Sequence, residues 1–196
     1  MPGAGDGRAG PRSRPSERLS SALVGGLRRH LAAGGVVAYP TESCYGLGCD
    51  PRSRSGVARV LALKGRSRAK GLILIAADFR QLASFVRAPT PEQRRSLAAA
   101  WPGPVTFVMQ ASIAAPPWIM GPRGTVAVRV TAHPGAAALC RALRTALVST
   151  SANRAGARPA RSYADCLRRF WSGAWVLPGR AGRRRRPSTI IELETG

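Results

Sequence analysis

Acidic residues are scarce in this chain of 196 amino acids. Nine Asp and Glu residues oppose 31 Lys and Arg residues, which leaves a formal net charge of +22. The carboxylates are scattered singly along the chain, whereas nucleases and polymerases that use two metal ions need them clustered. We therefore expect no metal cage built from carboxylates.

Histidine and cysteine are also rare, with two and four copies. No two cysteines form a C-x-x-C pair, which argues against a zinc site and favours reduced thiols. The serine-hydrolase elbow G-x-S-x-G is missing too. Cys44 and His133 could form a thiol nucleophile pair on paper, but we expect neither a metal site nor a protein nucleophile.

Long apolar runs are absent as well. No uninterrupted stretch reaches the length of a membrane span, and the N-terminus lacks the apolar segment of a secretory signal. We therefore expect a soluble, cytoplasmic protein. Residues 1–15 are rich in Gly, Pro and Arg and predict a disordered basic tail, whereas residues 16–196 predict a single globular domain.

Lysine is rare beside arginine: only Lys64 and Lys70 occur, and both lie in one seven-residue stretch. Two explanations of the excess arginine stay open. A positive field of this size attracts nucleotides, RNA or acidic surfaces, but a GC-rich coding bias would produce the same skew without any function. If arginine replaces lysine freely elsewhere, the two remaining lysines mark places where an ammonium group is needed.

Apolar periodicity predicts an α/β domain. Helical patterns alternate with short apolar runs, and the connections are too irregular for repeated β-α-β units, so we expect three layers around an open, twisted, mixed sheet. Neither G-x-G-x-x-G after the first strand nor G-x-x-x-x-G-K-[ST] occurs. The expected helices cover residues 16–33, 55–64, 78–85, 91–100, 134–144 and 162–170. The expected strands cover residues 36–39, 72–75, 105–109, 125–130, 147–149, 174–177 and 188–193.

Two polar segments follow a strand and a helix, at ends of elements where sites are usually built. Thr41 and Ser43 come directly after the first strand, in a segment whose glycines allow a ligand to approach the backbone. Lys64 and Arg66 end a helix, and a point charge beside a planar guanidinium suits phosphate. An ordinary turn and a pair of cations on the helix dipole remain open as simpler explanations.

Two further segments belong to strands. In residues 125–130 (TVAVRV) polar positions alternate with valines, so one face carries Arg129, either paired with a ligand carboxylate or solvated at a sheet edge. Residues 149–153 (STSAN) follow an apolar strand and offer four side-chain hydrogen-bonding groups for a phosphate or carbamate. The run Arg183–Arg186 is either a solvated loop or a contact for nucleic acid or phosphate.

Eight short motifs follow one another along the chain from about Ser16 onwards. In this order they closely resemble the YrdC/TsaC family of L-threonylcarbamoyladenylate synthases, in its short bacterial form. The resemblance implies an open, twisted sheet with a concave basic pocket, and L-threonine, bicarbonate and ATP with Mg²⁺ as substrates. The motifs are residues 39–42 (YPTE), 45–50 (YGLGCD), 63–66 (LKGR), 70–76 (KGLILIA), 101–107 (WPGPVTF), 127–131 (AVRVT), 149–153 (STSAN) and 187–189 (PST).

The resemblance also implies roles for single residues. The four catalytic positions of the family would be Lys64, Arg66, Ser151 and Asn153. Of these, Lys64, Arg66 and Ser151 would also contact ATP, together with Thr125. The positions that contact threonine would be Thr41, Arg129, Ser149 and Ser188.

The chain departs from the family pattern at three places. Ser67 and Gly71 stand where many relatives have proline. Relatives often continue beyond the last residues of this chain to an arginine that contacts ATP. The sequence therefore leaves open whether Arg183–Arg186 replaces that arginine.

The product of the family would be passed to a threonylcarbamoyl-transferase complex, for modification of adenosine 37 in tRNAs that read ANN codons. Weak binding of RNA or tRNA would be compatible with the charge. The main competing interpretation is an RNA-binding protein without catalysis. Such a protein should interleave aromatic and basic residues for base stacking, and aromatics make up only 6% of this chain. We therefore favour the enzyme, and we set aside a related carbamoyltransferase module because its zinc and acyl-phosphatase regions are missing.

Overall fold

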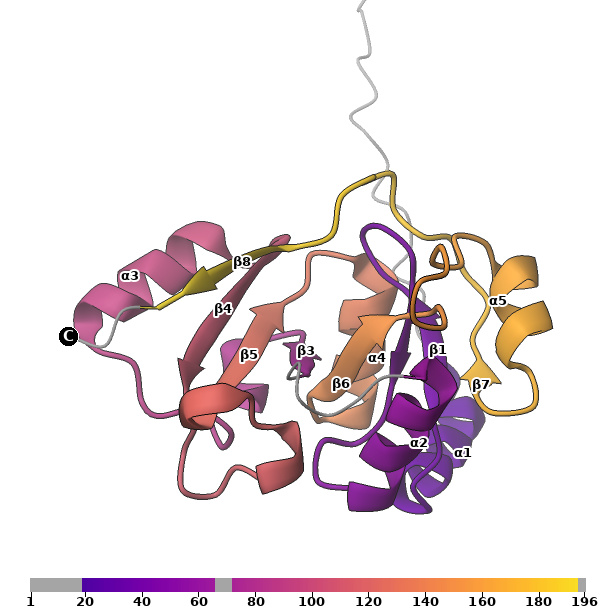
Figure 1. Cartoon of the computed structure of the whole chain (residues 1–196), viewed down its shortest axis with the longest axis horizontal. Helices are drawn as coiled ribbons and strands as arrows, with labels where there is room; N and C mark the ends of the chain where they lie inside the picture. The colour runs from indigo at the N-terminus through magenta and orange to yellow at the C-terminus, as the bar shows by residue number, and fades with distance from the viewer. Residues whose placement is uncertain (1–18, 66–71, 194–196) are drawn as a thin grey trace, which may run out of the picture.

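A computed structural model describes residues 19–65 and 72–193. It contains one eight-stranded sheet with helices on both faces (Figure 1). The basic tail expected over residues 1–15, and the expected site residue Arg66, lie outside the described residues. The helices are α1 (Ser21–Ala32), α2 (Arg54–Lys64), α3 (Pro91–Ala100), α4 (Pro134–Leu143) and α5 (Tyr163–Phe170). The strands are β1 (Val37–Pro40), β2 (Tyr45–Gly48), β3 (Ile73–Ala76), β4 (Val105–Gln110), β5 (Thr125–Val130), β6 (Leu147–Ser151), β7 (Trp175–Val176) and β8 (Thr189–Glu192).

The sheet is mixed, in the order β7-β1-β2-β6-β3-β5-β4-β8. Neighbours are parallel in the pairs β1/β7, β3/β5 and β4/β8, and antiparallel in the four other pairs. The expected mixed sheet is therefore confirmed. β3, β5 and β6 lie in its interior, so their side chains are placed by neighbours on two sides.

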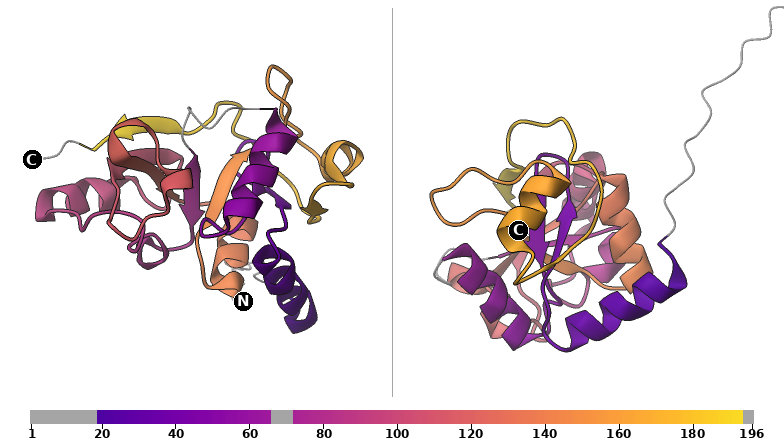
Figure 2. Two further views of the ribbon diagram at one scale, coloured as in Figure 1. Left: turned by 60° about the horizontal axis from the view of Figure 1, so that its bottom comes forward. Right: turned by 90° about the vertical axis from the view of Figure 1, so that its right-hand side faces the viewer.

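Strict alternation of side chains divides the core into two layers, one on each face of the sheet. In β1, Ala38 joins the core under α2 and α5, whereas Val37 and Tyr39 join the core under α1 and α4. Leu147 and Val148 of β6 separate in the same way. Figure 2 shows α1 and α4 on one side of the sheet and α2 on the other. The three-layer arrangement follows from this alternation.

Side-chain caps set the starts of most helices. The hydroxyls of Ser20, Ser53, Thr90 and Ser162 each accept a hydrogen bond from a backbone N–H in the first turn of the helix that follows. Gly65 caps the C-terminal end of α2 and adopts the left-handed conformation (φ 58°) that favours glycine. These caps fix where Lys64, the last residue of α2, stands relative to the sheet.

A long segment, residues 177–188, joins the two edges of the sheet, and we refer to it as the crossover segment. It runs from β7 to β8 and arches over one end of the strands (Figure 1). Its backbone is tied down at two points, where Gly182 donates to the carbonyl of Thr41 and Arg184 donates to the carbonyl of Glu42. The crossover segment therefore closes over the residues that follow β1.

Three sequence-based expectations need correction. The first helix begins at Ser21 instead of at residue 16, because the hydroxyl of Ser20 caps it. The helix expected over residues 78–85 is only a 3-10 turn at Phe79–Gln81. The strand β2 was not expected, since its sequence YGLG carries two glycines; a side chain at Gly48 would overlap the carbonyl oxygen of Val148 at 2.3 Å.

The remaining helices and strands lie within a few residues of their expected positions. In the part of the chain that the structure describes, no helix has the length and apolar character required to cross a membrane.

Candidate active site

A cavity of about 960 Å³ opens over one end of the strands, next to the crossover segment. The cavity lies on the same face of the sheet as α1 and α4, which cover the other end of the strands. Along β6 the change is stepwise on that face, from buried Leu147 to Ser149 and Ser151, which line the cavity. β6 thus carries a core residue at one end and polar groups at the other.

β5 forms the floor of this cavity and confirms the alternation expected from its sequence. Thr125, Ala127 and Arg129 line the cavity, while Val126 and Val128 are buried in the core on the opposite face. Arg129 is only 8% exposed and lies in an interior strand. It is therefore a buried charge within a sheet, which is costly without a counter-charge.

Glu42 supplies that counter-charge from the connection between β1 and β2. Its Oε2 lies 3.4 Å from a guanidinium nitrogen of Arg129, and both side chains are largely buried. Its Oε1 accepts hydrogen bonds from the hydroxyl of Thr131 at 2.7 Å and from the backbone N–H of Ala132 at 3.1 Å. Glu42 thus joins the β1–β2 connection, the end of β5 and, through its own carbonyl, the crossover segment.

Electrostatics agree with an ionised carboxylate at this position. Burial alone would raise the pKa of Glu42, but the charge of Arg129 and the hydrogen bonds from Thr131 and Ala132 outweigh burial, and the net pKa is lowered. Two atoms of the pair still lack a hydrogen-bond partner among the described residues, namely Oε2 of Glu42 and Nε of Arg129. Buried polar atoms without a hydrogen-bond partner are rare in folded proteins, and each one calls for an explanation.

Three of the four expected catalytic residues meet at the end of β6. The ammonium group of Lys64 lies 2.7 Å from the carbonyl oxygen of Ser151, 3.1 Å from its hydroxyl and 2.7 Å from Oδ1 of Asn153. The hydroxyl of Ser151 donates to the same Oδ1 at 2.6 Å. Lys64 is 4% exposed, so it stands behind Ser151 and fixes it, whereas Ser151 itself lines the cavity.

The positions expected to contact threonine share the cavity. Thr41, Ser149 and Ser188 line it together with Arg129. Thr41 donates its hydroxyl to the carbonyl of Cys44 at 2.8 Å, and the hydroxyl of Ser188 accepts from Thr106 at 2.9 Å. These groups come from the β1–β2 connection, from β6 and from the crossover segment, so only the fold brings them together.

Cys44 and His133 do not form a nucleophile pair. Burial raises the pKa of the Cys44 thiol, and a protonated thiol is a poor nucleophile. His133 caps α4, because its Nδ1 accepts from the backbone N–H of Ala136 and its Nε2 lies 3.1 Å from the carbonyl of Arg180. Within residues 19–65 and 72–193, no three His, Cys, Asp or Glu side chains form a group that could hold a metal ion.

Sequence reasoning missed two sets of residues at this site. Glu42 was quoted within a motif but given no role, although an acid beside a strand in a chain with nine acids was a usable signal. The other set could not be chosen from more than two dozen arginines without the fold. Its members, which line the cavity, are Arg123, Arg158 and Arg161, whereas Arg185, which also lines the cavity, belongs to the run Arg183–Arg186 that the sequence had offered as a phosphate contact.

Comparison with known proteins agrees with this arrangement. The family model named for Sua5, YciO and YrdC, described as "Telomere recombination", matches residues 29–196. The chain belongs to this family. A protein of Thiobacillus denitrificans named threonylcarbamoyl-AMP synthase is 57% identical over 171 residues, which are 87% of this chain and 91% of that protein. A protein of the same name from Chromobacterium violaceum is 53% identical over 185 residues, which are 94% of this chain and 96% of that protein.

The fold is shared with solved structures of the Sua5/YciO/YrdC family. The crystal structure of P. abyssi Sua5 complexed with L-threonine aligns with a TM-score of 0.82 and 31% identity, over 90% of this chain. The alignment covers 52% of that Sua5 chain, so this protein spans about half of its length. The family comparison therefore covers the whole sheet and the cavity described above.

The Glu42–Arg129 pair leads to a prediction about stability. Glu42→Gln leaves Arg129 buried without a counter-charge, so the free energy of unfolding should fall by about 3 kcal/mol at neutral pH. Because the pKa of Glu42 is lowered in the folded protein, its contribution to the free energy of unfolding is fully present at pH values above the ordinary pKa of a carboxyl group. This contribution is lost as the pH falls through the pKa of the folded state. Denaturant unfolding from pH 7 to pH 3 should show the two proteins converging in acid.

Glu92→Gln is the matched control, because Glu92 lies exposed in the first turn of α3. It should change the free energy of unfolding by less than about 0.5 kcal/mol. A Glu42→Gln protein as stable as the Glu92→Gln protein at pH 7 would contradict the role given to the pair.

Proposed function

We propose that this chain is a threonylcarbamoyl-AMP synthase, a nucleotidyltransferase that forms L-threonylcarbamoyladenylate and pyrophosphate from L-threonine, bicarbonate or CO₂, and ATP. The observation that carries the proposal is a single cavity that combines a buried guanidinium, at Arg129, with the hydroxyl of Ser151 held by Lys64 and Asn153. The names of relatives that share more than half of their residues with this chain support it.

Arg129 is the group best suited to the threonine carboxylate. Its guanidinium faces the cavity, and its buried Nε has no hydrogen-bond partner among the described residues. A carboxylate can accept two parallel hydrogen bonds from a guanidinium. The hydroxyls of Thr41, Ser149 and Ser188 line the same cavity and would orient the rest of the amino acid.

The reaction can proceed without a protein nucleophile. The threonine amine attacks the carbon of CO₂ and loses a proton, giving an N-carboxylate. A carboxylate oxygen then attacks the α-phosphorus of ATP, while the bond from that phosphorus to the bridging oxygen breaks and pyrophosphate leaves with the electron pair. The site has to position three substrates and stabilise negative charge on oxygen, which fixed donors in a partly closed cavity do well.

In this proposal, Lys64, Ser151 and Asn153 form the part of the site that acts on the reacting phosphate. Lys64 holds Ser151 and Asn153 in one geometry, and its charge raises the positive potential behind the Ser151 hydroxyl. The fourth family position, Arg66, is assigned to phosphate by the resemblance alone. In this proposal Mg²⁺ enters bound to the phosphates of ATP, which would supply its oxygen ligands.

The product is a mixed anhydride and must reach an acceptor before water destroys it. We propose that a threonylcarbamoyl-transferase complex takes it to adenosine 37 of tRNAs that read ANN codons, in the cytoplasm. Weak binding of RNA or tRNA by this chain remains a prediction from its charge.

The experiment that tests the proposed function is pyrophosphate release from ATP, with threonine and bicarbonate each present or omitted. Release should require both, and it should fall at least about 100-fold in Lys64→Ala, which removes the group that holds Ser151 and Asn153. Ser151→Ala removes only a hydroxyl and gives a second test if Lys64→Ala folds poorly. Full activity in folded forms of both variants, or release without threonine, would count against the proposal.

The assignment of Arg129 gives a separate prediction. Arg129→Lys keeps the charge beside Glu42 but loses the planar fork, so the KM for threonine should rise by about 10-fold or more while the KM for ATP changes little. Steady-state kinetics with each substrate varied in turn would measure the two KM values separately. Arg95→Lys, at an exposed position of α3, is the control and should leave both constants unchanged. Equal rises in both KM values would show that Arg129 supports the fold instead of threonine.

A further inference from the structure

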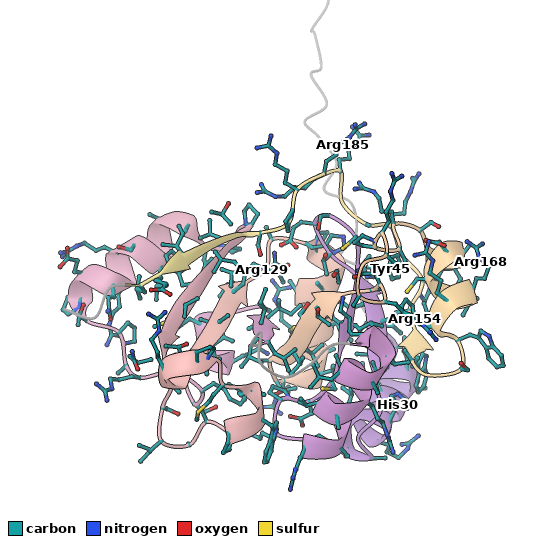
Figure 3. All side chains as sticks on the ribbon, viewed as in Figure 1. His30, Tyr45, Arg129, Arg154, Arg168 and Arg185 are labelled. Atoms are coloured by element: carbon teal, nitrogen blue, oxygen red, sulfur yellow. The ribbon has the colours of Figure 1, made fainter. Side chains whose placement is uncertain are left out.

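Three of the arginines that line the cavity have guanidinium groups without a partner among the residues that the structure describes. Arg158 and Arg161 belong to the loop that follows β6, and Arg185 belongs to the crossover segment. All three are exposed, and their guanidinium groups form no ion pair and no hydrogen bond with any residue that the structure describes. Figure 3 labels Arg185 on the crossover segment above the sheet.

The other arginines of the cavity differ in this respect. Arg129 pairs with Glu42, and Arg123 pairs with Glu192 across the ends of β5 and β8. Their charges are therefore balanced within the protein. The unbalanced positive charge of the cavity comes from Arg158, Arg161 and Arg185, so this is where the chain can accept a polyanion without displacing an internal partner.

The two ends of the cavity differ in chemistry. At the β4/β8 end the lining includes the apolar residues Val108, Pro122 and Ile190 together with Arg123 and Glu192, whose charges balance each other. At the β2/β6 end it includes Arg158 and Arg161, which follow Ser151 along the chain. A nucleoside triphosphate has the same asymmetry, with a largely apolar base at one end and up to four negative charges at the other.

The arginine loop is held firmly against the site. Asn153 donates to the carbonyl of Ala157 at 2.7 Å, and Arg169 of α5 donates to the carbonyl of Arg158 at 2.8 Å. Ala160 bridges the backbone of Ala152 and Tyr45, at 2.9 and 2.8 Å. Because Asn153 also contacts Lys64, the loop is positioned by the same residues that fix the hydroxyl of Ser151.

We propose that Arg158, Arg161 and Arg185 bind the β- and γ-phosphates of ATP and the departing pyrophosphate, with the base at the β4/β8 end of the cavity. The proposal rests on the proposed function. When the carbamate oxygen bonds to the α-phosphorus, the bridging oxygen leaves with the electron pair, so negative charge grows on pyrophosphate. Guanidinium groups placed there stabilise the leaving group and, in the reverse direction, recognise pyrophosphate.

The test compares the binding of ATP, AMP and pyrophosphate by calorimetry at fixed ionic strength. A triple variant, Arg158→Ala with Arg161→Ala and Arg185→Ala, should bind ATP and pyrophosphate about 10-fold more weakly or worse, while its affinity for AMP changes by less than about 3-fold. Since the three side chains are exposed and form no hydrogen bond or ion pair with any residue that the structure describes, the variant should fold. The wild-type preference for ATP over AMP should therefore shrink.

The matched control is Arg154→Ala with Arg183→Ala and Arg186→Ala. These arginines come from the same two segments and are exposed, but they do not line the cavity; Figure 3 labels Arg154 on the loop after β6. The control removes the same net charge and should keep ATP affinity within about 3-fold. Equal losses of ATP affinity in both triple variants would overturn the proposal, because the total positive charge would then account for ATP binding without specific contacts.

A fall in AMP affinity as large as the fall in ATP affinity would also overturn it, because the arginines would then contact the nucleoside monophosphate. Failure of the proposed function looks different. In that case the wild-type protein itself would bind no ATP, or would bind it without releasing pyrophosphate in the presence of threonine and bicarbonate.

Discussion

The burial of one positive charge governs this site. A guanidinium in an interior strand of a chain with a net charge of +22 needs a nearby carboxylate, and Glu42 provides it. Because the carboxylate of Glu42 also binds Thr131 and Ala132, and its carbonyl accepts from Arg184, the pair holds three segments together around the cavity. The guanidinium of Arg129 also lines the cavity, and its buried Nε has no hydrogen-bond partner among the described residues.

The sheet gives the rest of the site its shape. On one face of the sheet, β6 presents Leu147 to the layer of α1 and α4 and then Ser149 and Ser151 to the cavity. The layer of α1 and α4 therefore packs on one end of β6 and leaves the other end open to the cavity. Lys64 then reaches across from α2, on the opposite face, to fix Ser151 and Asn153 at the end of β6. Lys64 thus lies behind the cavity wall, and the hydroxyl-bearing Ser151 that it contacts lines the cavity.

Local patterns predicted much of this from the sequence. The alternation in residues 125–130 correctly placed Arg129 on a face with Thr125, and β5 begins and ends where it was expected. The edge-strand alternative for Arg129 was wrong, because only pairing between distant strands decides which strand is interior. β2 was missed because its glycines serve close strand packing, which local propensity does not show. The role of Glu42 depends on a contact 87 residues away in sequence, and no periodicity reports such a contact.

The most direct test of the account is the identity of the product. The protein would be incubated with threonine, ATP and ¹³C-labelled bicarbonate, and the mixture would be analysed at once by mass spectrometry. The account predicts an adenylate that carries threonine and one ¹³C atom, formed together with pyrophosphate. Conversion of ATP to AMP and pyrophosphate without labelled carbon in an adenylate, under conditions in which the product survives, would contradict the central claim that the cavity joins N-carboxylated threonine to the α-phosphate.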